Sequence, residues 1–136
     1  WCAVQGKRWL ARLGVDVDAP VREAWRGHLE RNGPLALDAI AAMKSAADAR
    51  GVAFAVTVYP FLAPPEANAF TQVDDYVITA CAAMGVPCIP LRDAYPAGDA
   101  LYERWSSIWD SHPDGVGHRL AAAWLAPRLL ELLASR

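Results

Sequence analysis

The feature that most restricts the fold is the run Val-Ala-Phe-Ala-Val-Thr-Val-Tyr at residues 52–59. The run is almost entirely apolar and rich in β-branched residues, and it shows no alternation of apolar and polar positions. Such a run is typical of a strand that is buried on both faces of a parallel sheet. Residues 86–91 predict a second, shorter strand. Pro87 and Pro90 favour a place at the sheet edge, because proline cannot donate to the strand ladder.

Helical patterns alternate with these two strands. An amphipathic helix is expected to start at Pro34 and end at Gly51, with its apolar row at Ala36, Ile40, Met43 and Ala47. A second helix is expected to end at Gly85, with its row at Phe70, Val73, Val77, Cys81 and Met84. A third is expected from about Val116 to Ser135, kinked or interrupted at Pro127. Residues 1–33 indicate only short helical pieces, around Trp9, Leu10 and Leu13 and around Trp25 and Leu29.

Alternating helices and strands predict an α/β fold with a parallel sheet in a single domain, residues 1–136. Two strands are few for such a sheet, so we expect it to be incomplete at its N-terminal side. Such a sheet would expose an unpaired edge and would favour association. The chain begins at Trp1 and shows no signal-peptide layout, so we interpret it as part of a longer protein and leave the compartment open.

Composition excludes several classes of function. The formal net charge is -2, and the 13 basic residues are scattered, which argues against a nucleic-acid partner. No apolar run reaches the roughly 18 residues of a membrane span. Cys2, Cys81 and Cys88 lack the spacing of zinc or redox motifs. Cys81 and Cys88 are interpreted as small core residues, and a disulfide between them is left open.

The segment Asp-Ser-His-Pro-Asp-Gly-Val-Gly-His, residues 110–118, is the main candidate for chemistry. Asp110 and His112 are two apart, so an extended backbone points both side chains to the same side. Pro113 favours that extended conformation at His112. A carboxylate beside one imidazole nitrogen fixes the tautomer and leaves the other nitrogen free to take a proton from a hydroxyl. Asp114 or Gly115 is expected to cap the helix that follows.

This segment, running into a terminal amphipathic helix, resembles the last conserved block of the SGNH/GDSL hydrolase superfamily, D-x-H-P-[ND]-x-x-G-H. The resemblance extends over roughly residues 34–136. It implies a flavodoxin-like three-layer parallel sheet and a serine esterase that acts on a small-molecule or carbohydrate acyl ester without a cofactor. It also implies that His112 is the general base, that Asp110 orients it, and that His118 has a structural role.

The chain departs from the superfamily pattern in two ways. The commoner spacing is D-x-x-H, whereas D-x-H resembles a subset that includes polysaccharide O-acetyl esterases and acetyltransferases. The G-D-S nucleophile block and the oxyanion-hole blocks are absent, and neither Asn32 nor Asn68 matches the oxyanion asparagine. None of the serines follows a Gly-Asp pair: Ser45, Ser106, Ser107, Ser111 and Ser135. We therefore expect the chain alone to be inactive, because triad members act as a unit.

Two other interpretations stay open. Asp110, His112 and His118 together match the usual count of three protein ligands for catalytic zinc. In the second interpretation, the chain is a degenerate or truncated domain with a binding or structural role. An aromatic cluster precedes the motif and either lines an acyl or sugar pocket or anchors the loop in the core: Tyr95, Tyr102, Trp105 and Trp109.

Overall fold

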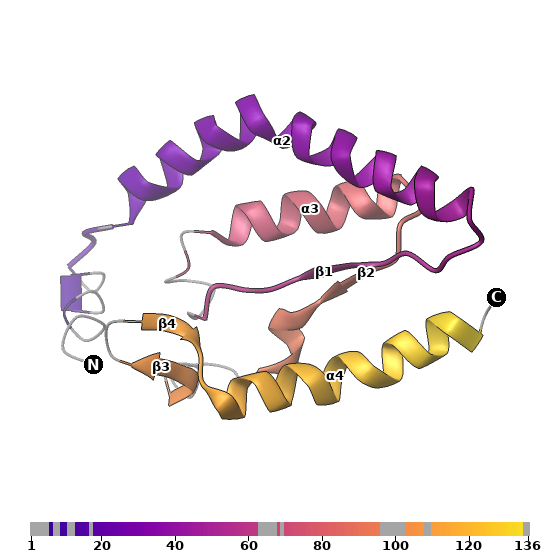
Figure 1. Cartoon of the computed structure of the whole chain (residues 1–136). Coiled ribbons are helices and arrows are strands. Elements are labelled where there is room, and N and C mark those ends of the chain that lie inside the picture. Colours follow the sequence, from indigo (N-terminus) through magenta and orange to yellow (C-terminus); the bar gives the residue numbers. More distant parts are fainter. Residues whose placement is uncertain are drawn as a thin grey trace.

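The computed structural model describes residues 6, 9–10, 13–16, 18–62, 68, 70–95, 103–107 and 110–134, with the backbone alone at 107, 110 and 111. In chain order the elements are α2 (Ala19–Asp48), β1 (Val56–Val58), α3 (Thr71–Ala83), β2 (Cys88–Pro90), a 3-10 turn η2 (Leu91–Ala94), β3 (Trp105–Ser107), β4 (Asp110–Pro113) and α4 (Gly115–Ala134). Figure 1 shows α2 and α3 on one side of the β1–β2 pair and α4 on the other.

Strands β1 and β2 pair in parallel, with Val56 opposite Cys88 and Val58 opposite Pro90. The parallel direction agrees with the sequence prediction, but the flavodoxin-like three-layer parallel sheet does not. In the described part of the chain the strands form two separate two-stranded sheets. The run 52–59 contributes only three residues to a ladder, because no described strand pairs with residues 52–55. Apolar content at these positions predicted burial, whereas a strand also needs a hydrogen-bonding neighbour.

Strands β3 and β4 form an antiparallel pair that the sequence did not predict. Trp105 lies opposite Pro113 and Ser107 opposite Asp110, with an irregularity of register between Trp105 and Ser107. Both strands are short and neither is a long apolar run, which is why the sequence analysis did not predict this pair. The hairpin leads directly into α4 and therefore sets where the motif segment lies.

Helix α2 differs from its prediction in length. It runs continuously for 30 residues and contains Pro34, which was expected to start it. Pro20 lies at its beginning, where a missing N–H costs nothing. Figure 1 shows α2 bending about its middle, as expected for an internal proline that removes one helical hydrogen bond. The ends predicted at Gly51 and Gly85 are confirmed, since both glycines adopt a positive φ of 64° just after α2 and α3.

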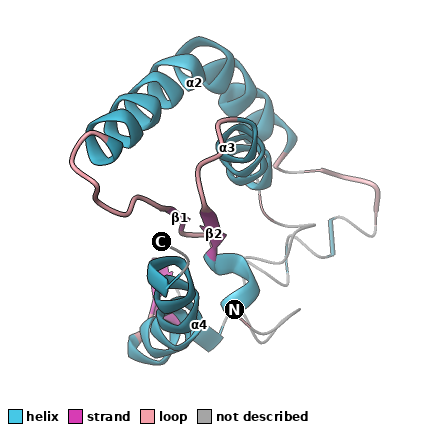
Figure 2. Ribbon diagram, turned by 90° about the vertical axis from the view of Figure 1, so that its right-hand side faces the viewer, coloured by secondary structure: helices cyan, strands magenta, loops and turns pink. Residues whose placement is uncertain are grey.

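The described core lies where η2 meets α4. Leu62, Leu91, Tyr95 and Ala121 are buried together, and Trp105, Leu120 and Trp124 are among the side chains that pack against them. Trp105 also donates its indole N–H to the carbonyl of Leu62, 2.5 Å away. Figure 2, which looks nearly along the strands, shows α4 covering one side of the strand pair. Helix α4 passes through Pro127 without interruption, contrary to one of the two outcomes expected there.

Candidate functional site

The motif segment begins in strand β4, and its extended backbone agrees with the prediction for Asp110 and His112. His112 is exposed at the end of this strand. The side chain of Asp110 lies outside the described residues, so the pairing of its carboxylate with the imidazole stays a prediction. The fold therefore supplies the backbone geometry that such a pair needs, two positions apart on one strand.

Asp114 connects β4 to α4 and is the predicted cap of the helix. Its Oδ1 accepts a hydrogen bond from the backbone N–H of Gly117 at 2.6 Å, which satisfies one of the free donors at the helix start. Its own N–H donates to the carbonyl of Arg104 at 2.7 Å. The guanidinium of Arg104 lies 3.8 Å from Oδ2. The carboxylate of Asp114 thus serves the structure of the turn.

Gly117 allows α4 to start close to β4. A Cβ at this position would lie 2.8 Å from the Cβ of Pro113 and 3.5 Å from Cε1 of Tyr95. The distance to Tyr95 is an ordinary contact, but at 2.8 Å from Pro113 something must move, and the Cβ of Pro113 belongs to a ring that cannot rotate away. The next residue, His118, donates its backbone N–H to the carbonyl of Asp114 at 3.0 Å. The close contact at Gly117 fixes the first turn of α4, and hence His118, relative to the strand that carries His112.

Two tyrosines extend the site from the β1–β2 pair. The hydroxyl of Tyr95 donates to that of Tyr59 at 2.6 Å. The ring of Tyr59 faces that of His118, with centroids 6.2 Å apart and planes tilted by 56°. Burial raises the pKa of Tyr95, and the hydrogen bond to Tyr59 and the charge of Asp114 add to the rise. Tyr95 therefore stays a neutral donor to the hydroxyl of Tyr59.

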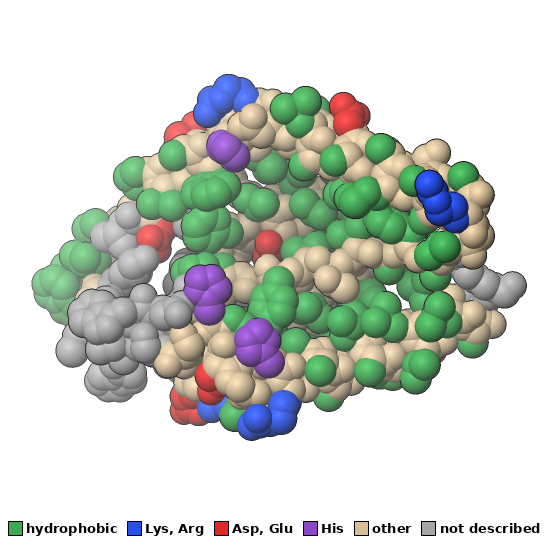
Figure 3. Space-filling view, in the orientation of Figure 1, with side chains coloured by type: hydrophobic (Ala, Val, Ile, Leu, Met, Phe, Trp, Pro, Cys, Tyr) green, Lys and Arg blue, Asp and Glu red, His purple; other side chains and the backbone are tan. Residues whose placement is uncertain are grey.

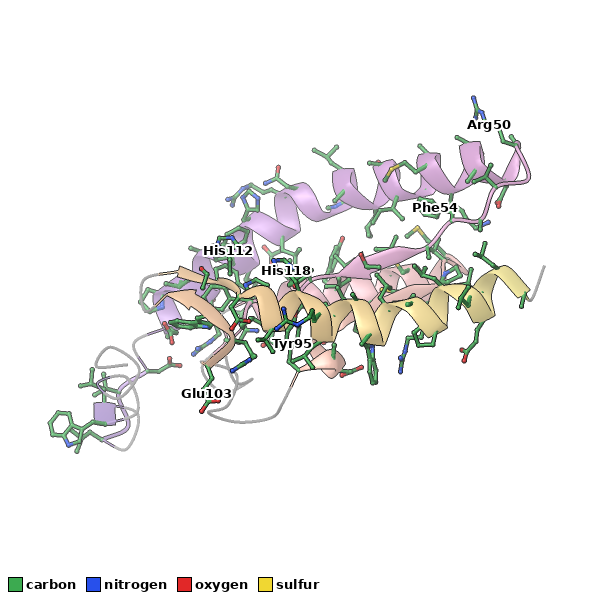
Figure 4. All side chains as sticks on the ribbon, turned by 60° about the horizontal axis from the view of Figure 1, so that its bottom comes forward. Arg50, Phe54, Tyr95, Glu103, His112 and His118 are labelled. Carbon is green, nitrogen blue, oxygen red and sulfur yellow. The ribbon has the colours of Figure 1, made fainter. Side chains whose placement is uncertain are left out.

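These side chains gather at the carboxyl end of the β1–β2 pair. Tyr59 follows the last residue of β1, and Tyr95 follows β2 after the short turn η2. In parallel sheets this end is where ligands most often bind. Figure 4 shows His112, His118 and Tyr95 near the start of α4. We call His112, His118, Tyr59 and Tyr95 the histidine–tyrosine site.

Sequence reasoning found both histidines but missed the role of Tyr59. The signal was its position as the last residue of the run 52–59, because the carboxyl end of a parallel strand is where ligands most often bind in such sheets. For Tyr95 and Trp105 the structure supports the core interpretation of the aromatic cluster, since both belong to or pack on the buried cluster. Tyr102 and Trp109 lie outside the described residues.

Asn68 has a structural role. It is buried, accepts the N–H of Phe70 at 2.8 Å and donates to the carbonyl of Phe61 at 3.4 Å. Both ends of its amide thus bond to the loop that precedes α3. This structural role agrees with the sequence analysis, in which Asn68 did not match the oxyanion motif. Ser45 lies exposed on α2 and Ser106 exposed on β3. The side chains of Ser107 and Ser111 and all of Ser135 fall outside what the structure describes.

Metal and thiol chemistry gain no support from the described residues. They contain no group of three His, Cys, Asp or Glu side chains arranged for a metal ion. The predicted ligand set Asp110, His112 and His118 is only partly covered by that finding, because it includes the undescribed carboxylate of Asp110. Cys81 and Cys88 are both free thiols, and Cys81 is fully buried. Burial raises the pKa of Cys88 to about 11, which keeps this thiol protonated and unreactive.

Comparison with known proteins does not assign the chain to a family. No family model matches the chain, and no curated protein or solved structure is significantly similar to it. The resemblance of residues 110–118 to the SGNH/GDSL block thus stays a prediction. Among the described helices, none is long and apolar enough to cross a membrane.

Proposed function

We propose that this chain supplies the acid–base pair of a serine esterase acting on acyl esters, with His112 as general base and Asp110 as its orienting acid. The observation that carries the proposal is the path of residues 110–118. An extended strand presents His112 to solvent and is followed at once by a capped helix, whose start is held against the strand by Gly117. This path supports a fixed position for the imidazole at the carboxyl end of the β1–β2 pair.

In this proposal His112 takes the proton of a serine hydroxyl as the hydroxyl attacks the acyl carbon, and then returns the proton to the departing alkoxide. Asp110 keeps the imidazole in the tautomer that exposes the accepting nitrogen, and it stabilises the imidazolium. Tyr59 offers a hydroxyl proton to a polar atom of the ester or its alcohol. The serine and the oxyanion donors belong to residues outside 1–136, since no serine here follows a Gly-Asp pair.

The pairing of Asp110 with His112 is tested by long-range ¹H–¹⁵N NMR, which distinguishes the two neutral tautomers of each histidine. We expect His112 in the wild type to hold its proton on Nδ1, facing the carboxylate, and Asp110→Asn to redistribute this proton between the two nitrogens. Asp114→Asn is the matched control, because that carboxylate caps α4. A His112 tautomer that is the same in wild type and Asp110→Asn contradicts the proposed pair.

The location of the nucleophile is tested separately, with a small aryl acetate as substrate. We expect the chain and its His112→Ala variant to release the aryl alcohol at the same slow rate, because the base has no serine to activate. Turnover that falls in His112→Ala and in one serine variant, such as Ser106→Ala, would place the whole triad in this chain. That result would be consistent with the acid–base roles of Asp110 and His112. It would contradict only the proposal that the serine lies outside residues 1–136.

A further inference from the structure

Three aromatic rings from separate parts of the chain meet in the described structure. Phe70, just before α3, contacts Trp25 of α2, with ring centroids 5.1 Å apart. Phe70 also contacts Phe61, the third residue after β1, with centroids 5.2 Å apart. The ring planes are inclined by 76° and 55°, so the rings meet at steep angles and do not stack flat. We call Trp25, Phe70 and Phe61 the aromatic strip.

The two outer rings of the aromatic strip remain in contact with solvent. Trp25 is 37% exposed and Phe61 is 38% exposed, while Phe70 between them is half-buried. A cluster that served only the core would bury its outer rings more fully, because aromatic side chains stabilise a fold by leaving water. Exposed apolar groups that touch one another, unlike scattered ones, mark surfaces that bind a ligand or a partner. The aromatic strip therefore offers ring surface to a further group.

The aromatic strip lies beside the histidine–tyrosine site. Only Pro60 separates Phe61 from Tyr59, so the Cα atoms of these two aromatic residues are at most about 7 Å apart. Both residues follow β1, at the end where ligands most often bind in parallel sheets. Figure 1 shows the end of β1, the start of α3 and the start of α4 at the same end of the molecule. In Figure 3, hydrophobic side chains lie between the histidine over α2 and the other two histidines of the chain.

The two neighbouring surfaces differ in what they can bind. The rings of the aromatic strip carry no charge, and such rings pack well on other flat rings. The hydroxyl of Tyr59 accepts from Tyr95, and a phenol hydroxyl can also donate. Small-molecule sites commonly combine many apolar contacts with a few polar groups that fix the orientation of the ligand. A ligand that suits both surfaces therefore joins an aromatic ring to a hydrogen-bond acceptor a short distance away.

We propose that the aromatic strip binds the ring of an aryl ester whose ester group lies at the histidine–tyrosine site. The ester group in this inference rests on the proposed esterase function, whereas the ring is assigned from the aromatic strip alone. Phe61 determines the specificity, because it is the member of the strip closest along the chain to Tyr59. A flat ring is favoured over an aliphatic group of similar size, since edge-to-face and offset contacts between rings add to the burial of apolar surface.

The first test measures binding to the purified chain by saturation-transfer NMR, since the chain alone is expected not to hydrolyse the esters. Phenyl acetate carries its ring on the alcohol side, methyl benzoate carries it on the acyl side, and cyclohexyl acetate is the control without an aromatic ring. We expect at least one aryl ester to bind roughly two- to tenfold more tightly than cyclohexyl acetate. The tighter of the two aryl esters identifies the side of the ester that carries the ring. Absence of binding, or equal binding of all three esters, would overturn the proposal.

A matched pair of variants locates the binding. Phe61→Leu keeps an apolar side chain but removes the ring, so it should weaken binding of the aryl ester roughly two- to tenfold and leave cyclohexyl acetate unaffected. Phe54→Leu makes the same substitution before β1, and Figure 4 shows Phe54 far from His112 and His118. This control should bind the aryl ester as the wild type does, with circular dichroism as the check that both variants fold. Equal losses in the two variants would show that the ring does not bind at the aromatic strip.

The esterase proposal is judged separately, from the tautomer of His112. Suppose that the tautomer is unchanged in Asp110→Asn while Phe61→Leu still weakens binding of the aryl ester. The acid–base pair would then be wrong, and the aromatic strip would stand as a binding surface. If instead the tautomer responds to Asp110→Asn and Phe61→Leu has no effect on binding, the acid–base pair would stand and the role of the strip would be wrong.

Discussion

Asp74 is a carboxylate that the fold holds out of water in the first turns of α3. It is 8% exposed, and burial raises its pKa from 3.8 to about 6; Arg92 opposes this rise and Asp75 adds to it. Because the folded state binds the proton more tightly than the unfolded chain, the resulting stabilisation is complete below about pH 4. It is lost as the pH rises through about 6.

We expect Asp74→Asn to remove this dependence on pH. The variant should be more stable than the wild type at pH 7.5, by about 1–2 kcal/mol, and should lose its advantage near pH 4. Urea unfolding at a series of pH values measures the difference. Asp75→Asn is the control: it removes the ion pair with Arg92 but should keep the step due to Asp74. A constant difference between wild type and Asp74→Asn at all pH values would contradict this account.

Gly115 and Gly117 are two residues apart in α4 but have different surroundings. Gly117→Ala should destabilise the chain by about 1–3 kcal/mol, because its Cβ would overlap Pro113. Gly115→Ala meets only the flexible end of Arg119 at 3.7 Å and should be neutral or stabilising by up to about 1 kcal/mol. Chemical unfolding of both variants compares the two, and similar losses would show that the contact with Pro113 is not decisive.

For single residues, the sequence predicted the backbone conformation of the segment 110–118 but not how its side chains pack. Spacing and Pro113 were enough to predict an extended backbone at His112, and Asp114 was named as a possible cap. The contact of Gly117 with Pro113 depends on the angle at which α4 leaves the strand. The approach of Tyr59 to Tyr95 and His118 depends on pairing between segments 36 residues apart, which local patterns do not encode.

Helices α2 and α3 cross at a point where one residue must be glycine. A Cβ at Gly33 would lie within 2.9 Å of three ring and hydroxyl atoms of Tyr76. Gly33→Ala should therefore push the helices apart and cost about 1–3 kcal/mol. Gly27→Ala, in the same helix, meets only the mobile end of Arg31 and should gain about 1 kcal/mol from helix propensity.

The contact itself is isolated by a double-mutant cycle with Tyr76→Ala. If the overlap with the ring causes the loss, Gly33→Ala should cost little in the Tyr76→Ala background. An unchanged cost would assign the effect to the backbone of α2, near the bend at Pro34, and would contradict the packing explanation. Thermal unfolding followed by circular dichroism suffices for all four proteins.

The sequence predicted the ends of α2 and α3 correctly from glycine. It predicted the start of α2 wrongly from Pro34. Gly51 and Gly85 adopt the positive φ that ends α2 and α3. Pro34 lies inside α2 because the apolar row continues through it, from Leu29 to Leu37 and Ile40 on the side facing α3. Tertiary packing of a long amphipathic face outweighs the cost of one lost hydrogen bond, and that balance is invisible in a local pattern.

The part of the molecule that the structure describes has a small buried core. The described core comprises Leu62, Cys81, Val86, Ile89, Leu91, Tyr95 and Ala121. The sequence predicted the apolar content but placed it in a larger parallel sheet, of which the described residues form the β1–β2 pair. Several large apolar side chains remain exposed among the described residues, including Leu35, Leu130 and Leu133. Stability should therefore depend strongly on each member of the core.

Leu62 tests this dependence, since it is 1% exposed and packs between η2 and α4. Leu62→Ala should cost about 2–4 kcal/mol, from lost burial and the cavity left behind. For a chain of this size that loss should lower the melting temperature by roughly 10 °C. Leu130→Ala removes the same atoms from a side chain that is 67% exposed and should change stability by less than about 0.5 kcal/mol.

Calorimetry of both variants compares a buried with an exposed leucine, and the contrast locates the core. Equal shifts in melting temperature would mean that the cluster around Leu62 does not hold the fold together. A large shift for Leu62→Ala alone would show that the cluster around Leu62 stabilises the fold. Because Tyr95 belongs to this cluster and bonds to Tyr59, the histidine–tyrosine site should be lost in the same transition.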